Sequence, residues 1–258
     1  MKRIARIIPC LLLSDRRLVK TVRFSDPLYI GDPVNAVKIF NEKEVDELVV
    51  LDISASRQGR QPDFALIEEM AGEAFMPVTY GGGIRAFDDV RQLIRCGVEK
   101  VAVNEAATMS TDLIRDVVST FGRQAVVGVV DVKRNFFGAY RATFRSGTRN
   151  VRAGLIDHVL RLQEAGIGEL LVNDVDRDGT QLGYDMQLFR KIVDAVDIPV
   201  VACGGARSLE NLREVVLECG VDGAAAGSLF VFHGKHRAVL ITYPSGLEIE
   251  IPVRRLRQ

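Results

Sequence analysis

The sequence lacks an excess of charge of either sign. Its 258 residues include 34 basic and 34 acidic side chains, giving a formal net charge of zero. A neutral chain offers no general electrostatic attraction to nucleic acid or to an anionic membrane. Long hydrophobic runs are also missing: no apolar stretch approaches the roughly 20 residues of a membrane-spanning helix. The apolar run after the opening Met-Lys-Arg ends at Leu13, which is too short for a signal peptide. We therefore expect a cytoplasmic protein with no nucleic-acid or membrane partner.

Cysteine and histidine are scarce, with four and three residues respectively. The three histidines, His158, His233 and His236, form no set of metal ligands. The cysteines lie in apolar segments without metal-ligand spacing, so we expect them to be reduced and packed in the core; they are Cys10, Cys96, Cys203 and Cys219. The sequence thus predicts no metal site and no cofactor.

What the sequence does contain is an internal repeat. Three pairs of segments match in constant order, 122 or 123 positions apart: 51–53 with 173–175, 77–85 with 199–207, and 96–99 with 219–222. Self-similarity at this period predicts two equivalent halves of about 120 residues each. We place the two halves at about 1–122 and 123–233, followed by an extension at 234–258.

Short apolar runs alternate with amphipathic segments along the whole repeat. The apolar, β-prone runs are 5–13, 47–53, 77–81, 99–104, 125–132, 168–174, 198–203 and 222–227. The segments of helical period between them include 34–45, 64–74, 87–96, 113–121 and 188–196. Such alternation favours parallel strands joined by helical crossovers. We predict one (β/α)₈ TIM barrel over residues 1–258. The alternative, an open doubly wound sheet, predicts neither equal halves nor two related glycine loops.

The end of the chain departs from this alternation. Two β-prone runs, 238–243 and 247–251, flank Pro244-Ser245-Gly246, where an eighth helix would be expected. Pro-Ser-Gly between such runs predicts a β-hairpin. A hairpin there would cover the flank of the barrel or join an oligomer interface.

Glycine-rich loops follow two of the predicted strands. Gly81-Gly82-Gly83 ends the third strand and Gly204-Gly205 ends the seventh, at repeat spacing. Glycine lets backbone N–H groups approach an anion without a Cβ atom in the way. Active sites of (β/α)₈ barrels lie at the carboxyl ends of the strands. A single loop could be only a tight turn, but two related loops favour a ligand with a phosphate at each end.

The segment 176–180, Asp-Arg-Asp-Gly-Thr after the sixth strand, joins these loops in a family resemblance. Together they resemble the HisF family, the cyclase subunit of imidazole glycerol phosphate synthase, from about residue 5 to 233. The sister isomerase of histidine biosynthesis shares the half-barrel symmetry, but the loop 176–180 fits HisF better. The resemblance implies a phosphorylated small-molecule ligand, bound through a lysine that matches Lys20. It places one phosphate at Gly83 and Asn104, and the other at Asp178, Gly179, Gly205 and Ser228.

The family closes an imidazole ring and cleaves a C–N bond, as a cyclase and lyase, with two aspartates on opposite sides of the substrate. The resemblance implies that Asp131, inside the apolar run 125–132, is one of them. A buried aspartate is costly unless it has a partner or a task. The alternative is an aspartate paired with Lys133 or Arg134.

The resemblance also shows two departures. Leu12 stands where the family has its other aspartate, and leucine neither accepts nor donates a proton. Asp15 is the nearest carboxylate and would have to reach back from the following loop. Glu105 replaces a family threonine at a phosphate site, where a carboxylate repels phosphate unless a cation intervenes. These departures put the ring-closing reaction in question.

At the amino ends of its strands, the family receives ammonia from a HisH-like glutaminase. Four residues match the family's ring of charges that forms the ammonia gate: Arg6, Glu47, Lys100 and Glu169. The alternative is that these charges only close the floor of the barrel, since partly buried ions need partners anyway.

Four further segments are similar to a subgroup of glycosyl amidation-associated HisF-like proteins: 7–13, 18–21, 31–36 and 40–48. That similarity implies that ammonia passes through the barrel to a separate sugar amidotransferase in surface polysaccharide biosynthesis, which converts an acetamido group to an acetamidino group. One alternative is a genuine cyclase subunit of histidine biosynthesis. Another is a non-catalytic scaffold that binds a phosphorylated ligand and regulates a partner.

Overall fold

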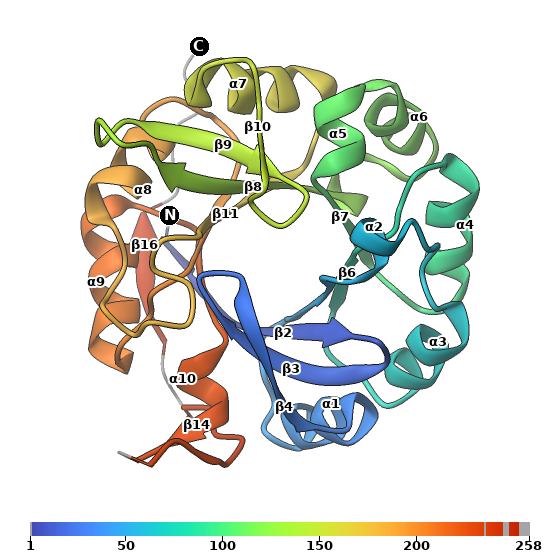
Figure 1. The fold of residues 1–258 in the computed structure, drawn as a ribbon, viewed down its shortest axis with the longest axis vertical. Helices are drawn as coiled ribbons and strands as arrows, with labels where there is room; N and C mark the ends of the chain where they lie inside the picture. The colour runs from blue at the N-terminus through green and yellow to red at the C-terminus, as the bar shows by residue number, and fades with distance from the viewer. Residues whose placement is uncertain (1, 235, 245–247, 253–258) are drawn as a thin grey trace.

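Eight parallel strands close into a barrel in the computed structural model, which describes residues 2–234, 236–244 and 248–252. Each strand pairs in parallel with the next, and the eighth pairs with the first. Figure 1 shows the strands as a ring with the helices outside it. The barrel strands are β2 (Arg6–Ser14), β5 (Leu48–Asp52), β6 (Val78–Gly81), β7 (Lys100–Val103), β8 (Val126–Arg134), β11 (Glu169–Asp174), β12 (Val200–Cys203) and β13 (Gly223–Ala226). The predicted (β/α)₈ barrel is confirmed, while the equivalence of its two halves stays a prediction.

In the described part of the chain, seven amphipathic helices cover the outside of the barrel. They are α1 (Pro33–Glu42), α3 (Phe64–Gly72), α4 (Phe87–Arg95), α6 (Asp112–Phe121), α7 (Leu155–Ala165), α8 (Met186–Val193) and α9 (Leu209–Cys219). Several begin at a polar side chain that accepts a backbone N–H of the first turn, as Asp32 does for α1 and Ser208 for α9. None of the helices in the described ranges combines the length and the hydrophobicity needed to cross a membrane.

Side chains of the barrel strands alternate between two hydrophobic cores. Ile7 and Leu11 of β2 pack outward against the helices. Ile8, Cys10 and Leu12 point inward and fill the barrel axis with residues of the other strands. This alternation follows from the period of two in a strand. Leu12 therefore faces the inside of the barrel near the carboxyl end of its strand.

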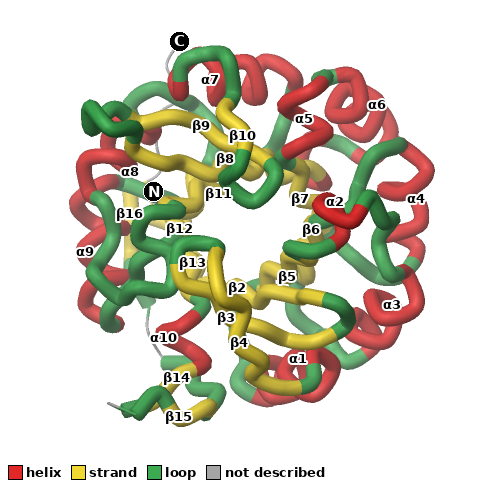
Figure 2. Tube along the Cα trace, viewed as in Figure 1, coloured by secondary structure: helices red, strands yellow, loops and turns green. Residues whose placement is uncertain are grey.

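Two antiparallel extensions lie over the carboxyl ends of the strands. β3 (Arg17–Val22) and β4 (Ser25–Gly31) continue from β2, while β9 (Tyr140–Phe144) and β10 (Arg149–Asn150) continue from β8. Figure 2 shows both as strands beside the barrel opening. A loop was expected after the first strand, and no element was predicted for residues 140–150. Three short helices complete the connections: α2 (Ala55–Gln58), α5 (Glu105–Met109) and the 3₁₀ helix η1 (Arg123–Ala125).

The C-terminal segment differs from the expected hairpin. The eighth helix is reduced to α10 (Ser228–Val231), after which β14 (Phe232–His233) pairs with β15 (Ala238–Val239). β16 (Glu250–Pro252) pairs instead with β1 (Lys2–Ile4). The expected turn at Ser245-Gly246 lies outside the described residues. Ile249 and Ile251 are buried in the outer core, so this segment covers the flank of the barrel, one of the two expected roles.

Candidate functional site

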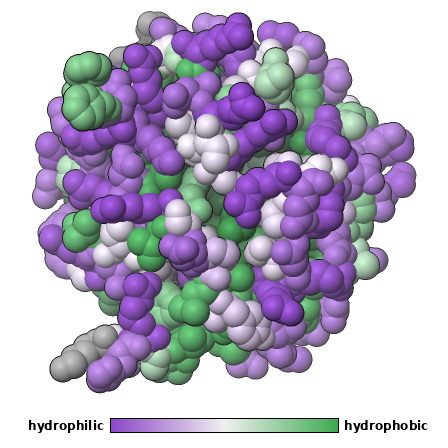
Figure 3. All heavy atoms as spheres, in the orientation of Figure 1, coloured by the Kyte–Doolittle hydropathy of each residue, from purple (hydrophilic) through white to green (hydrophobic). Residues whose placement is uncertain are grey.

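A cavity opens at the carboxyl ends of the strands. Its larger part, of about 140 Å³, is lined by the glycine loop 81–83, Asn104, Glu105 and Asp131, and we call it the first compartment. The second compartment, of about 30 Å³, is lined by Lys20 and by three segments, 178–179, 203–206 and 226–228. Leu12 and Asn173 line both compartments and therefore lie between them. Figure 3 shows hydrophobic residues near the centre of this face and a hydrophilic rim around them.

A buried lysine supplies the positive charge of the second compartment. Lys20 of β3 is 6% exposed, and its Nζ donates to the carbonyl oxygen of Cys10 at 2.6 Å. Asp178 accepts a hydrogen bond from Thr21 Oγ1 at 3.0 Å. Burial raises the pKa of Asp178 above its usual value, and the charge of Lys20 opposes this rise. The structure thus brings Lys20 and Asp178, 158 positions apart, to one cavity.

Two glycines of this compartment have no space for a side chain. A Cβ atom on Gly179, which has a φ of +69°, would lie 2.0 Å from the carbonyl oxygen of Thr21. A Cβ atom on Gly205, with a φ of +99°, would lie 2.4 Å from the carbonyl oxygen of Gly183. Ser228 also lines the compartment and begins α10, which has only four residues. The helix that begins at this compartment is therefore a single short turn.

Asp131 lies in the first compartment near the end of β8. It is 7% exposed, and its Oδ2 accepts a hydrogen bond from Asn104 Nδ2 at 2.8 Å. Burial raises the pKa of Asp131 to about 7, and the negative charge of Asp178 adds to this rise. The hydrogen bond from Asn104 and the charge of Lys133 act in the opposite direction. A carboxyl group with a pKa near neutrality is suited to transfer a proton.

The alternative pairing of Asp131 with its basic neighbours is not what the structure shows. Lys133 Nζ donates to the carbonyl oxygen of Gly147 at 3.1 Å. Arg134 forms an ion pair with Asp185 at 2.6 Å. Both cations are thus engaged with other groups.

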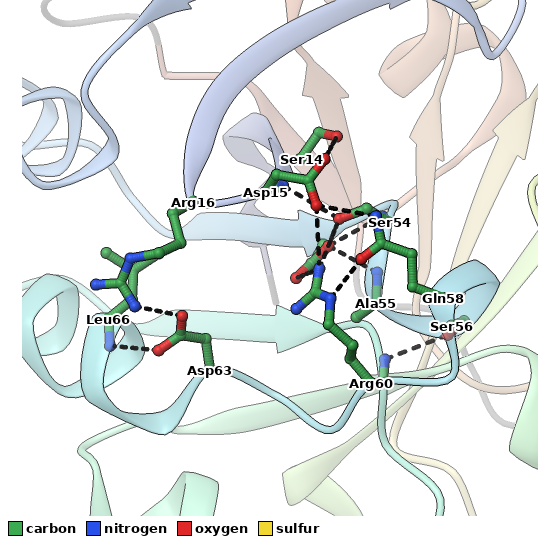
Figure 4. Close-up of polar contacts among 12 residues, drawn as sticks. Ser14, Asp15, Arg16, Ser54, Ala55, Ser56, Gln58, Arg60, Asp63 and Leu66 are labelled. Carbon is green, nitrogen blue, oxygen red and sulfur yellow. Dashed lines mark hydrogen bonds and ion pairs between the residues drawn. The ribbon is translucent and has the colours of Figure 1, made fainter.

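The residue that faces the cavity from β2 is apolar. Leu12 is 7% exposed and lines both compartments, where the family resemblance implies an aspartate. Asp15 does not replace it, because Asp15 lies in the tight turn between β2 and β3 and is not among the residues that line the cavity. It accepts from Gln58 Nε2 at 2.9 Å and donates its N–H to Ser54 Oγ at 3.2 Å (Figure 4). Asp15 therefore does not reach back into the cavity from this turn.

Glu105 meets a cation that sequence reasoning did not find. Its Oε1 accepts a hydrogen bond from Arg145 Nε at 2.5 Å, and Arg145 comes from the turn between β9 and β10. In the same compartment the N–H of Gly83 donates to Ser56 Oγ at 3.2 Å. Figure 4 shows Ser56 on α2, beside the network around Asp15.

Two further polar residues of the cavity were missed. Asp52, at the end of β5, is buried, and its Oδ1 accepts from the N–H and Oγ of Ser54 and from the N–H of Ala55. Asn173, near the end of β11, is also buried, and its Oδ1 has no hydrogen-bond partner within the described ranges. The sequence contained a signal for them, because Asp52 and Asn173 lie in the repeated segments 51–53 and 173–175, at the ends of predicted strands.

At the opposite end of the barrel, the four predicted charges form a closed ring. Arg6 contacts Glu47 at 2.5 Å and also pairs with Glu169. Lys100 Nζ lies 2.9 Å from Glu47 Oε1 and 3.3 Å from Glu169 Oε2. Each cation thus bridges both carboxylates across the barrel axis. Thr79 Oγ1 adds a hydrogen bond to Glu47 at 2.8 Å.

The ring keeps its charges because each has a partner. Burial alone would raise the pKa of Glu47, but Arg6 and Lys100 together hold that pKa below its usual value. Burial would lower the pKa of Arg6, but Glu169 and Glu47 raise it. Removing one cation would leave the two buried carboxylates to share the other, so one negative charge would be uncompensated, which is strongly destabilising.

The protein is thus a (β/α)₈ barrel with a cavity at the carboxyl ends of its strands and a closed ring of charges at their amino ends. The family model described as "Histidine biosynthesis protein" matches residues 6–237. A Pseudomonas aeruginosa protein named "Putative imidazole glycerol phosphate synthase subunit hisF2" is 50% identical over 95% of this chain and 98% of its own length. The "Imidazole glycerol phosphate synthase subunit HisF" of Alkaliphilus metalliredigens is 39% identical over 97% of this chain and 98% of its own. The chain belongs to the HisF family.

Proposed function

We propose that this chain is a barrel subunit that admits ammonia at its floor and delivers it to the cavity at its mouth. The ammonia would come from a HisH-like glutaminase docked at the amino ends of the strands. The observation that carries the proposal is the alignment of three features along one axis: the charge ring, the inner core and the mouth cavity.

The inner core favours neutral ammonia over ammonium as the species that crosses the barrel. Between the ring and the mouth the axis is filled by apolar residues such as Ile8, Val49 and Leu171. A charged group without partners is costly in such surroundings, whereas a small neutral molecule is not. The ring in the described structure is closed, so passage requires Arg6 or Lys100 to move away from a carboxylate.

Two fates of the ammonia are supported by different observations. The names of the relatives favour the ring-closing reaction of imidazole glycerol phosphate synthase, with Asp131 as one proton-transfer group. Leu12 favours transfer to a separate acceptor enzyme, such as a sugar amidotransferase, because no carboxylate faces the cavity from β2. No relative's name mentions a sugar acceptor, so this second fate rests on Leu12, and it is the one that we follow in expecting no ring closure by the natural chain.

Coupling to a glutaminase tests the entry of ammonia at the floor of the barrel, which both fates share. We expect the natural chain to bind a HisH-like glutaminase and to raise its rate of glutamine hydrolysis at least tenfold. Lys100→Ala should alter this coupling because Glu47 and Glu169 lose a shared cation. Arg16→Ala serves as the control, since Arg16 is exposed at the opposite end of the barrel. Failure of the natural chain to bind or stimulate the glutaminase would contradict the proposal.

A further inference from the structure

The hairpin that continues from β8 carries two exposed aromatic side chains at its tip. Phe136 is 98% exposed and Phe137 is 89% exposed, and their rings lie edge to face with centroids 5.6 Å apart. Figure 3 shows a hydrophobic projection at the upper left rim, where Figure 1 draws the turn between β8 and β9. A single exposed apolar residue is ordinary on a protein surface. Two adjacent aromatic rings in water instead offer the large anchors on which binding to a partner depends.

The backbone that presents these rings is held in place by polar contacts. Asn135 Oδ1 accepts a hydrogen bond from the N–H of Phe137 at 3.0 Å. At the base of the turn, Arg134 pairs with Asp185 at 2.6 Å, and its guanidinium lies 4.7 Å from the centroid of the Tyr140 ring. An anchor on a fixed backbone loses less entropy when a partner covers it, which favours binding.

Positive charge is concentrated in the same hairpin. Residues 133–152 include six basic and no acidic side chains, although the whole chain has equal numbers of each. Arg141, Arg149 and Arg152 are exposed and pair with no carboxylate among the described residues. The other three cations of the segment are held by neighbouring groups. The hairpin therefore complements a surface that carries negative charge.

The hairpin also forms a groove of about 470 Å³. Its lining residues come from β8, β9, β10 and the adjoining turns, and three of the six are cations: Lys133, Arg134, Asn135, Arg141, Asn150 and Val151. Carboxylate side chains that project from a folded protein could enter this groove and bind its cations. A flat lipid bilayer would leave it unfilled. The shape and the charge together favour an acidic protein surface as the occupant.

This surface lies at the end of the barrel where ammonia has to leave. β8 continues to Arg134, beyond its pairing with β11, and the second turn of the hairpin lines the first compartment through Arg145 and Ser146. A glutaminase at the amino ends of the strands would leave the hairpin uncovered. Ammonia that escapes into water at neutral pH becomes ammonium, which is not a nucleophile. An enzyme that uses the ammonia must therefore cover the mouth.

We propose that Phe136, Phe137 and the cations of this hairpin form the docking surface for the enzyme that consumes the ammonia. The partner would present an apolar pocket to the two rings and carboxylates to Arg141 and Arg149. The inference rests on the second fate in the proposed function, transfer to a separate acceptor enzyme. It deepens that function by assigning the surface through which the barrel and the acceptor enzyme meet.

Reconstitution of the full chain with a HisH-like glutaminase and a sugar amidotransferase of the same organism tests the inference. Glutamine is the nitrogen source, and mass spectrometry measures the amidino product. The double variant Phe136→Ser, Phe137→Ser should lower glutamine-driven amidation about tenfold or more, and should weaken binding of the amidotransferase by a similar factor. Arg141→Glu should act in the same direction, because it replaces attraction by repulsion.

Leu217→Ser is the matched control, because Leu217 is 57% exposed on α9, outside the hairpin. It should leave glutamine-driven amidation unchanged. The phenylalanine variant should still bind and stimulate the glutaminase, which shows that its barrel is folded.

Three results would overturn the inference. Equal glutamine-driven amidation by the phenylalanine variant and the Leu217→Ser control would do so and leave the proposed function intact. Binding to phosphatidylserine vesicles that the phenylalanine variant loses, with amidation unchanged, would assign the surface to a membrane instead. If the natural chain stimulates the glutaminase but supports no glutamine-driven amidation, the inference and the second fate both fail, while the admission of ammonia stands.

Discussion

Leu12 and Asp131 face the same cavity from β2 and β8, and of these two only Asp131 can transfer a proton. The sequence predicted both positions because each lies in an apolar strand that matches the family. It did not predict the contacts that set their environment. The hydrogen bond from Asn104 joins residues 27 positions apart, and Arg145 reaches Glu105 across 40 positions. Such contacts depend on where the loops fold, which apolar periodicity does not encode.

The raised pKa of Asp131 predicts a pH-dependent change in stability. Its folded pKa of about 7 lies above the ordinary value of 3.8, so the folded chain binds the proton more tightly than the unfolded chain. The contribution of Asp131 to the free energy of unfolding therefore decreases as the pH rises from about 4 to about 7. Asp131→Asn removes the titration and should raise the free energy of unfolding at pH 8 by up to about 4 kcal/mol.

Urea unfolding at pH 5 and pH 8 measures this effect. The difference between Asp131→Asn and the natural chain should be smaller at pH 5 than at pH 8. The same substitution at Asp116, which is exposed on α6, should show no such change with pH. A difference that is equal at both pH values would contradict the assigned environment of Asp131.

At the scale of elements, continuous apolar runs predicted the eight barrel strands, because strands buried on both faces contain few polar residues. The predicted run 47–53, for example, contains β5 (Leu48–Asp52). The hairpins β3–β4 and β9–β10 were missed because their sequences mix polar and apolar residues, and because β4 and β10 are largely exposed. Their structure comes from pairing with β2 and β8 rather than from a hydrophobic pattern.

The close packing of β3 against the loop after β11 makes Gly179 a sensitive position. Gly179→Ala should destabilise the fold by about 1–2 kcal/mol through its positive φ, and more through the contact with Thr21. It should also weaken phosphate binding at least tenfold, because the loop must move away from Lys20.

Gly138→Ala is the matched control for this change. Gly138 also has a positive φ, of +79°, but a Cβ atom there meets nothing within 4 Å. Thermal unfolding and phosphate titration of both variants should separate backbone strain from loss of the second compartment. Equal phosphate affinity in the two variants would contradict the role of the loop.

At the scale of the whole molecule, the barrel has a charge ring at its floor and a cavity at its mouth. Arg6 and Glu169 are 163 positions apart, so no local pattern predicts their contact; the family resemblance did. The ring, the apolar axis and the glycine loops are in place. The second carboxylate at the mouth is replaced by Leu12. Our account is therefore of an ammonia-admitting barrel without the paired acid and base of ring closure.

The most direct test of that account is an ammonia-dependent cyclase assay at mildly alkaline pH, with the bis-phosphorylated histidine-pathway intermediate as substrate. Free ammonia removes the need for the glutaminase, so the assay reports only on the mouth of the barrel. The account predicts that the natural chain is silent and that Leu12→Asp gains activity, which Leu12→Asn does not. Turnover by the natural chain on the order of 1 s⁻¹ or above would contradict it and identify a working cyclase.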